Sequence, residues 1–214
     1  MKYNIITLNI DDAQYPKKLR DIYNPPNKLY CLGDVSLFNN ESIAIIGCRN
    51  ASPYGLKIAK IFSQGISNKG VTIISGFAKG IDSEAHINSI DNIGKTIAVL
   101  GCGLDVIYPK ENKDLYSQII DKGGLIVSEF PLGTKPFREN FPIRNRIVSA
   151  LADALIVVEA KRRSGTMITV DYALEQGKEI YAVPGNIDSL NSVGTNDLIK
   201  MGAIPITSYL ELFT

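Results

Sequence analysis

The sequence predicts an α/β protein built on a doubly wound, mostly parallel sheet. Short runs rich in isoleucine and valine recur along the chain, each is almost continuously apolar, and helix-like stretches separate them. Continuous rather than alternating hydrophobicity is typical of strands that helices cover on both faces, and such strands pair in parallel. The expected strands are residues 43–46, 71–74, 96–100, 125–127, 154–158 and 180–183.

Two of the intervening helices have clear ends in the sequence. Ser52 and Pro53 form an N-cap with proline in the first turn, and apolar spacing continues from there to a stop at Gly70. A second helix is expected from Ser164 to Gly177. Each helix follows a strand directly or after a short loop, so both helix N-termini should open onto the carboxyl edge of the sheet.

The two ends of the chain differ from this repeating pattern. Residues 1–40 contain a proline pair, several tyrosines and a possible strand at 28–31, so we expect an N-terminal extension or small subdomain there. The main domain is expected over residues 41–214. Its tail, 204–214, is expected as the end of a strand followed by a short helix.

The composition excludes several classes of protein. With 214 residues, 45% apolar and 21% charged, the chain is typical of a globular domain rather than a disordered, fibrous or disulfide-rich protein. Cys31, Cys48 and Cys102 form no Cys-x-x-Cys pair, which argues against zinc and against an oxidising compartment. No signal peptide and no apolar run of about 18 residues is visible. We therefore expect a cytoplasmic protein with no metal and no membrane partner.

The charge is balanced overall but uneven along the chain. Lysine and arginine number 23 against 22 aspartates and glutamates, and a net charge of +1 gives no whole-molecule attraction for nucleic acid. Residues 135–163, however, hold seven basic side chains and three acids, a local charge of +4. The rest of the chain therefore sums to −3, and the basic side chains are concentrated in one part of the sequence.

Two glycine-rich turns are expected to lie side by side at the carboxyl edge of the sheet. Residues 47–52 follow a strand, and their helix start and Arg49 suit a phosphate; the other interpretation is a turn with a solvated arginine. Residues 75–82 form the second turn, and the two would border a crevice. Neither turn has the dinucleotide fingerprint Gly-x-Gly-x-x-Gly, so no cofactor is expected.

The most informative segment is residues 135–146, which contain four basic residues, two phenylalanines and one acid. Basic side chains neutralise phosphates and aromatic faces accept stacked bases, the combination used to bind nucleic-acid single strands. The alternative is that Phe137 and Phe141 anchor the core and the charges are solvated.

A second basic run is expected at the same edge of the sheet. Residues 161–163 follow a strand, and in a parallel sheet this loop lies at the same edge as Arg49. Residues 164–166 then offer hydroxyls and amides at a helix start, which should cap the helix and also suit a phosphate or ribose. The single histidine, His86, has no partners placed by the sequence to complete a catalytic triad and is expected to be structural.

These segments resemble the DNA-processing protein A family, also called Smf, over roughly residues 15–203. Six segments occur in the same order and at compatible spacing, which makes the resemblance highly specific. They are GCRNASPYG (47–55), ISGFAKGIDSEAH (74–86), LGCGLDVIYPKEN (100–112), SEFPLGTKPFRENFPIRNRIVSAL (128–151), EAKRRSGTMITVDYALEQGKEIYAVPG (159–185) and GTNDLIKMGA (194–203).

The resemblance implies an extended Rossmann-like sheet whose positively charged pocket takes the phosphate backbone of single-stranded DNA, without catalysis. Members of the family protect incoming single strands, load a RecA-type recombinase during natural transformation and form homodimers. Longer members carry an N-terminal helical domain and a winged-helix-like C-terminal domain, neither of which is expected here. The family's DNA-binding positions correspond to Arg49, Lys135, Phe141, Arg144, Asn145 and Arg146.

Pattern and resemblance together give two sets of candidate residues, with no catalytic or metal-binding residue among them. If about four phosphates are neutralised, the logarithm of affinity falls with the logarithm of salt concentration at a slope of about −3. The nucleic-acid-binding set is Gly47, Arg49, Ser52, Lys135, Arg138, Asn140, Phe141, Arg144, Asn145, Arg146, Lys161 and Arg162. The phosphate or nucleotide pocket set is Ser75, Gly76, Ala78, Gly80, Ser164, Gly165 and Thr166.

Two other functions stay open. A nucleoside-monophosphate phosphoribohydrolase of the lysine-decarboxylase-like family would use a similar nucleotide pocket. That family has a Pro-Gly-Gly-x-Gly-Thr loop followed by a catalytic glutamate, whereas residues 163–166 here have no glutamate three residues on. A relative that senses a nucleotide or a DNA end in phage defence would need the same pocket chemistry.

Overall fold

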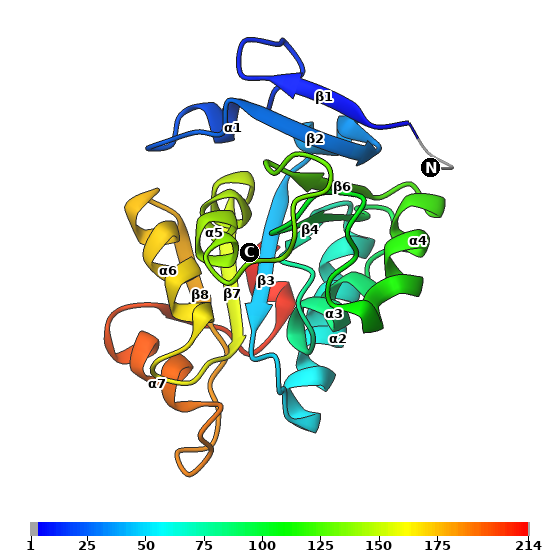
Figure 1. Ribbon diagram of the computed structural model, residues 1–214. Coiled ribbons are helices and arrows are strands. Elements are labelled where there is room, and N and C mark those ends of the chain that lie inside the picture. Colours follow the sequence, from blue (N-terminus) through cyan, green and yellow to red (C-terminus); the bar gives the residue numbers. More distant parts are fainter. Residues whose placement is uncertain (1–3, 214) are drawn as a thin grey trace.

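The computed structural model describes residues 4–213, and within that range nine strands form one sheet (Figure 1). The strand order is β1-β2-β6-β5-β4-β3-β7-β8-β9, in which β1–β2 and β2–β6 pair antiparallel and all other neighbours pair parallel. The predicted fold class is therefore confirmed. The strands are β1 Ile6–Asn9, β2 Lys28–Gly33, β3 Ser42–Gly47, β4 Thr72–Ser75, β5 Thr96–Val99, β6 Leu125–Ser128, β7 Ala154–Glu159, β8 Glu179–Ala182 and β9 Ile204–Pro205.

The direction of winding reverses at β3. From β3 the chain adds β4, β5 and β6 on one side, then returns to place β7 against the other side of β3 and continues outward through β8 and β9. The six neighbouring strands β5-β4-β3-β7-β8-β9 have the Rossmann order. In that order a ligand crevice lies outside the carboxyl ends of the strands, at the point where the strand order reverses.

Helices cover both faces of the sheet, and this explains the continuous hydrophobicity of the strands. Along β3, Ile43 and Ile45 pack in the cluster under α2 and α3, whereas Ala44 and Ile46 pack in the cluster under α5 and α6 (Figure 1). The first face carries α2 Pro53–Asn68, α3 Ile81–Ile87 and α4 Lys113–Asp121; the second carries α1 Lys17–Arg20, α5 Asn140–Leu151, α6 Gly165–Glu175 and α7 Val193–Lys200. Short 3-10 turns complete the fold: η1 Val35–Asn39, η2 Lys110–Asn112 and η3 Tyr209–Phe213.

The two predicted helix starts have different outcomes. Ser52 caps α2, because its Oγ accepts a hydrogen bond from the Gly55 amide at 3.1 Å. Ser164 precedes α6 as predicted, but its side chain makes no capping hydrogen bond, so the predicted cap is wrong. The Ser164 Oγ is buried and has no hydrogen-bond partner within residues 4–213.

The N-terminal segment completes the sheet. β2, predicted as a possible strand, pairs with β6, and β1, which was not predicted, forms the edge beyond it. The division at residue 40 stays a prediction, although the sheet itself runs across it. The tail contains β9 and η3, as expected for a strand end and a short helix; Thr214 lies outside the described residues.

Cys31, Cys48 and Cys102 are unpaired and buried. Within residues 4–213, no helix has the length and hydropathy needed to cross a membrane.

His86 is a core residue. Its Nδ1 lies 2.7 Å from the Thr96 Oγ1, its ring packs against Phe77, and no partner for its Nε2 is found in the described chain. Burial, aided by the positive charge of Arg144, lowers the pKa of His86 to about 3. A neutral and fully enclosed imidazole agrees with the structural role predicted for His86.

We predict that His86 does not titrate in the folded protein between pH 5 and 8. Because the unfolded chain binds a proton near pH 6.5 and the folded chain does not, His86 lowers the free energy of unfolding as pH falls from about 6.5 toward 3, by up to about 1.4 kcal/mol per pH unit. The chemical shift of the single imidazole, followed by NMR against pH, checks this. A folded-state midpoint near 6.5 would contradict it, and the urea-unfolded chain is the positive control.

Candidate functional site

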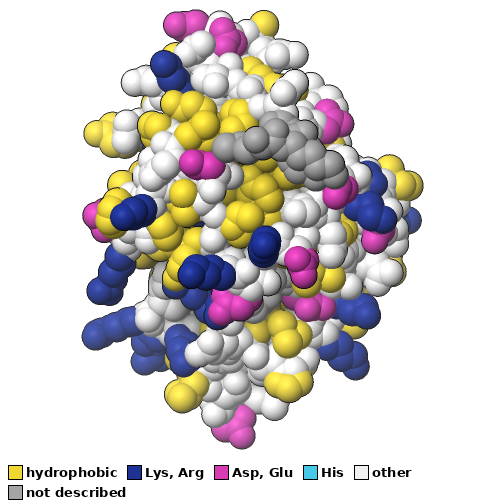
Figure 2. Space-filling view, turned by 45° about the vertical axis from the view of Figure 1, so that its right-hand side comes forward, with side chains coloured by type: hydrophobic (Ala, Val, Ile, Leu, Met, Phe, Trp, Pro, Cys, Tyr) yellow, Lys and Arg dark blue, Asp and Glu magenta, His cyan; other side chains and the backbone are white. Residues whose placement is uncertain are grey.

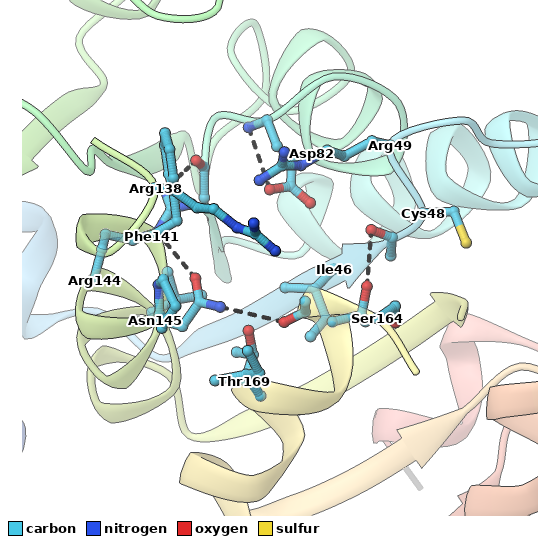
Figure 3. Close-up of a pocket in the computed structure, with 18 of the residues that line it drawn as sticks. Ile46, Cys48, Arg49, Asp82, Arg138, Phe141, Arg144, Asn145, Ser164 and Thr169 are labelled. Carbon is cyan, nitrogen blue, oxygen red and sulfur yellow. Dashed lines mark hydrogen bonds between the residues drawn. The ribbon is translucent and has the colours of Figure 1, made fainter. Parts of the chain in front are cut away.

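A cavity of about 710 Å³ opens at the carboxyl ends of the central strands, where the strand order reverses. Its walls are the loops after β3, β4 and β7 together with the first turns of α5 and α6 (Figure 3). Twelve predicted site residues come together here, although their role in binding stays a prediction. They are Gly47, Arg49, Gly76, Ala78, Arg138, Phe141, Arg144, Asn145, Lys161, Ser164, Gly165 and Thr166.

The cavity carries excess positive charge around an aromatic ring. Arg49, Arg138 and Lys161 are exposed, and no carboxylate in residues 4–213 forms an ion pair with any of them. The Arg49 guanidinium carbon lies 5.5 Å from the centroid of the Phe141 ring, and the centroids of the Tyr108 and Phe141 rings are 5.6 Å apart. Arg49 and Arg138 approach the cavity from opposite walls (Figure 3). Such a site suits an anion linked to a flat ring.

Arg144 forms part of the floor rather than a free binding group. Its guanidinium donates to the carbonyl oxygens of Gly76 and Val99, and its Nε donates to the Asn145 Oδ1 at 3.1 Å. A Cβ on Gly76 would lie 2.9 Å from this guanidinium, so only glycine leaves the arginine room. Burial lowers the pKa of Arg144 to about 10, which still leaves it charged at neutral pH.

Asp82 is the acidic side chain that lines the cavity, and sequence reasoning missed it. It accepts a hydrogen bond from the Ala78 amide at 3.3 Å. Burial raises the pKa of this carboxyl, whereas the charges of Arg144 and Arg49 oppose the rise. The Asp82 carboxyl therefore interacts electrostatically with both Arg144 and Arg49, although it forms no ion pair with either of them within residues 4–213.

Two polar side chains tie the cavity walls to one another. The Asn145 amide nitrogen donates to the Gly165 carbonyl at 3.3 Å and thereby joins α5 to the start of α6. The Thr166 Oγ1 donates to the Gly47 carbonyl at 3.1 Å and joins α6 to the end of β3. Both predicted residues are thus part of the framework as well as of the cavity lining.

The start of α2 is already occupied by an anion from the protein. The Glu159 carboxylate accepts hydrogen bonds from the Ser52 amide at 2.9 Å and from the Ser52 hydroxyl. The predicted open helix start after Gly47 is therefore wrong: Ser52 caps α2 and binds Glu159 but does not line the cavity. The signal in the sequence was an acid directly after the apolar strand run 154–158.

The start of α6 has the opposite character. The first amides of a helix have no partner within the helix, and here no side chain caps them. Gly165, Thr166 and Ser164 line the cavity beside Lys161. Of the two predicted helix starts, α6 is thus the one that presents unused donors to the cavity.

Two predicted arginines bind carboxylates elsewhere. Arg146 points away from the cavity and forms a two-pronged ion pair with Glu129, at 2.6 and 2.7 Å, and its Nε donates to the Asn24 carbonyl. Arg162 is paired with Asp197 at 2.7 Å. Neither lines the cavity, and the ion pair of each neutralises its charge.

The remaining predicted residues also lie outside the lining. Asn140 is buried and donates to the carbonyls of Gly101 and Lys135, so it holds the loop that carries Lys135, which is itself exposed. The Ser75 hydroxyl donates to the Ile45 carbonyl within the sheet. Gly80 has a φ of +77°, and a Cβ there would lie 2.3 Å from the Cys48 carbonyl oxygen, so it permits close packing of two loops.

Basic side chains are also unevenly placed on the surface. Figure 2 shows lysine and arginine side chains gathered at the lower left of one face, whereas basic and acidic side chains alternate on the right. Within residues 4–213 no group of three potential metal ligands comes together.

Comparison with known proteins identifies relatives over nearly the whole chain. The family model described as DNA recombination-mediator protein A matches residues 6–214. Protein Smf of Escherichia coli is 41% identical over 94% of this chain, and the DNA processing protein DprA of Streptococcus pneumoniae is 43% identical over 94% of it. The chain spans about half (54%) of the length of the first protein and 71% of the second.

Solved structures agree with this match. The crystal structure of DNA processing protein A from Streptococcus pneumoniae has a TM-score of 0.92 at 41% identity, covering all of this chain and 74% of that one. A structure of the Helicobacter pylori protein, described by its single-stranded-DNA-binding mode, has a TM-score of 0.88 at 33% identity, covering 99% and 94%. A molybdenum-cofactor-binding protein from Rippkaea orientalis, at 19% identity and a TM-score of 0.57, shares the fold alone.

We predict that Glu129→Gln destabilises the protein by about 3 to 5 kcal/mol, because it leaves the Arg146 guanidinium largely buried without its counter-charge. Urea unfolding of both proteins measures the difference. The matched change at an exposed pair, Glu111→Gln beside Lys79, should leave the midpoint almost unchanged. Equal effects of the two substitutions would show that the Arg146 pair is not structural.

Proposed function

Because the chain belongs to the DNA recombination-mediator protein A family, we propose that it binds single-stranded DNA, protects incoming strands and helps to load a RecA-type recombinase during natural transformation. The observation that carries the proposal is that Arg49, Arg138 and Lys161, which form no ion pair within residues 4–213, line one cavity together with Phe141, and that Arg49 lies over the Phe141 ring. Cations neutralise phosphates, and an aromatic ring stacks on any base, so the site requires no particular sequence.

The proposal gives each side chain a separate task. Arg49, Arg138 and Lys161 contact phosphate oxygens, and Phe141 with Tyr108 offers aromatic surface to a base. Arg144 and Asn145 keep the walls in place from below. A duplex presents its bases stacked inside, where Phe141 does not reach them, so single strands are the preferred ligand.

The same proposal includes two partners and a location. We infer that the protein forms a homodimer, works beside a RecA-type recombinase and acts in the cytoplasm, where incoming strands would meet that recombinase. Light scattering after gel filtration tests for the dimer. Co-purification with the recombinase of the same cell, with and without oligonucleotide, tests for the second partner.

We propose no catalysis. In the competing hydrolase a glutamate would stand three residues after Thr166, and here that position is Thr169, whose hydroxyl is a poor proton carrier. Incubation of the protein with nucleoside monophosphates should release no free base, as measured by chromatography. Base release that disappears in Thr169→Ala would instead establish the enzyme.

A gel-shift comparison of single- and double-stranded oligonucleotides at two salt concentrations tests ligand class and strandedness together. With three unpaired cations, the slope of log affinity against log salt should be about −2 per site, shallower than the −3 that the sequence suggests. Preference for the duplex, or a slope near zero, would contradict the proposal.

Two neighbouring residues provide a matched pair of variants. Lys161→Ala should weaken binding and make the salt slope shallower by about 0.7, because one phosphate contact is lost. Arg162→Ala should change neither, since Arg162 is paired with Asp197 and lies outside the cavity lining. Fluorescence anisotropy titrations over a salt series measure both. Equal losses in the two variants would remove Lys161 from the site.

A further inference from the structure

Glu159, at the end of β7, holds together the loops after β3 and β8. It is 1% exposed and binds the amide and the hydroxyl of Ser52 in the loop after β3. From the loop after β8, the Asn191 amide nitrogen lies 3.3 Å from the same carboxylate and 3.0 Å from the Asn50 carbonyl. The Glu159 carboxylate on β7 therefore accepts hydrogen bonds from two other segments, the loop after β3 and the loop after β8.

We propose that Glu159 determines which helix start the DNA backbone uses. Its carboxylate takes the anion position at the start of α2, closes that position to phosphate and leaves the start of α6 as the one that binds the backbone. The inference rests on the proposed function, since it assigns the phosphate subsite within the same cavity.

The two helix starts lie at the same edge of the sheet, but α2 has a side-chain cap, a proline in its first turn and the Glu159 carboxylate, whereas, among the described residues, α6 has none of these. Both α2 and α6 begin at the carboxyl edge of the sheet, and each N-terminus presents amides and the positive end of a helix dipole. At α2 the anion is present and bound through two hydrogen bonds. A phosphate placed there would meet a like charge in a buried setting, where water screens the repulsion poorly.

Packing closes the start of α2 as well. A Cβ on Gly55, in the first turn of α2, would lie 2.4 Å from the Glu159 carboxylate, so the helix turn and the carboxylate are in direct contact. At α6, by contrast, the Ser164 Oγ is buried and has no partner within residues 4–213, and Lys161 lines the same cavity a few residues before the helix. An unused hydroxyl and one of the unpaired cations thus lie beside the α6 start.

The experiment follows backbone amides by NMR while inorganic phosphate, and separately oligothymidylate, is added to the full chain. In the unchanged protein the amides of Gly165 and Thr166 should shift and that of Ser52 should not. In Glu159→Ala, which removes both the charge and the side chain that fills the position, the Ser52 amide should become responsive. Glu179→Gln, an exposed acid at the amino end of β8, makes the same change in net charge and should leave Ser52 silent.

Two results would overturn the inference: a Ser52 amide that responds as strongly as Gly165 in the unchanged protein, or one that stays silent in a folded Glu159→Ala. If Glu159→Ala does not fold, the comparison of the Ser52 and Gly165 amides in the unchanged protein decides the question. Failure of the proposed function is distinguishable, because then oligothymidylate shifts none of these amides.

Discussion

At β3 the chain reverses the direction in which it adds strands. The connection after β3 runs to one side of the sheet and the connection after β7 runs to the other, so a gap stays open at the carboxyl ends of these two strands. That gap is where the loops after β3, β4 and β7 meet. The cations, the aromatic ring and both helix starts belong to segments that enter or leave this one place. The position of the cavity therefore follows from topology, and only its chemistry depends on particular side chains.

A buried polar framework keeps that chemistry in place. Arg144 reaches from α5 beneath the loop after β4, and Asn145 and Thr166 connect α5, α6 and the end of β3. Burying such groups is unfavourable unless their hydrogen bonds are satisfied, and for these three side chains they are. The exposed cations above the framework then project from walls that are already fixed relative to one another, which reduces the ordering cost of binding.

The strands were predictable because burial on both faces makes each strand a continuous apolar run. The general position of the site followed, because loops after parallel strands meet at the carboxyl edge of the sheet. The separate roles of the arginines were less visible. Arg144 and Arg146 stand two residues apart, about 200° around a helix, so one turns toward the loop after β4 and the other toward Glu129. Treating residues 135–146 as one basic segment hides this, whereas helical spacing would have separated them. The pairing of Arg162 with Asp197 joins segments 35 residues apart and has no local trace.

The antiparallel pairing of β2 with β6 bears on how the chain can be shortened. β6 is buried along its whole length, and β2 supplies the hydrogen bonds that its outer edge requires. A fragment that began at the apparent domain boundary near residue 40 would expose a bare apolar edge, the kind of surface that recruits strands from other molecules and leads to aggregation. The N-terminal segment thus protects the protein from aggregation, although none of its residues lines the cavity.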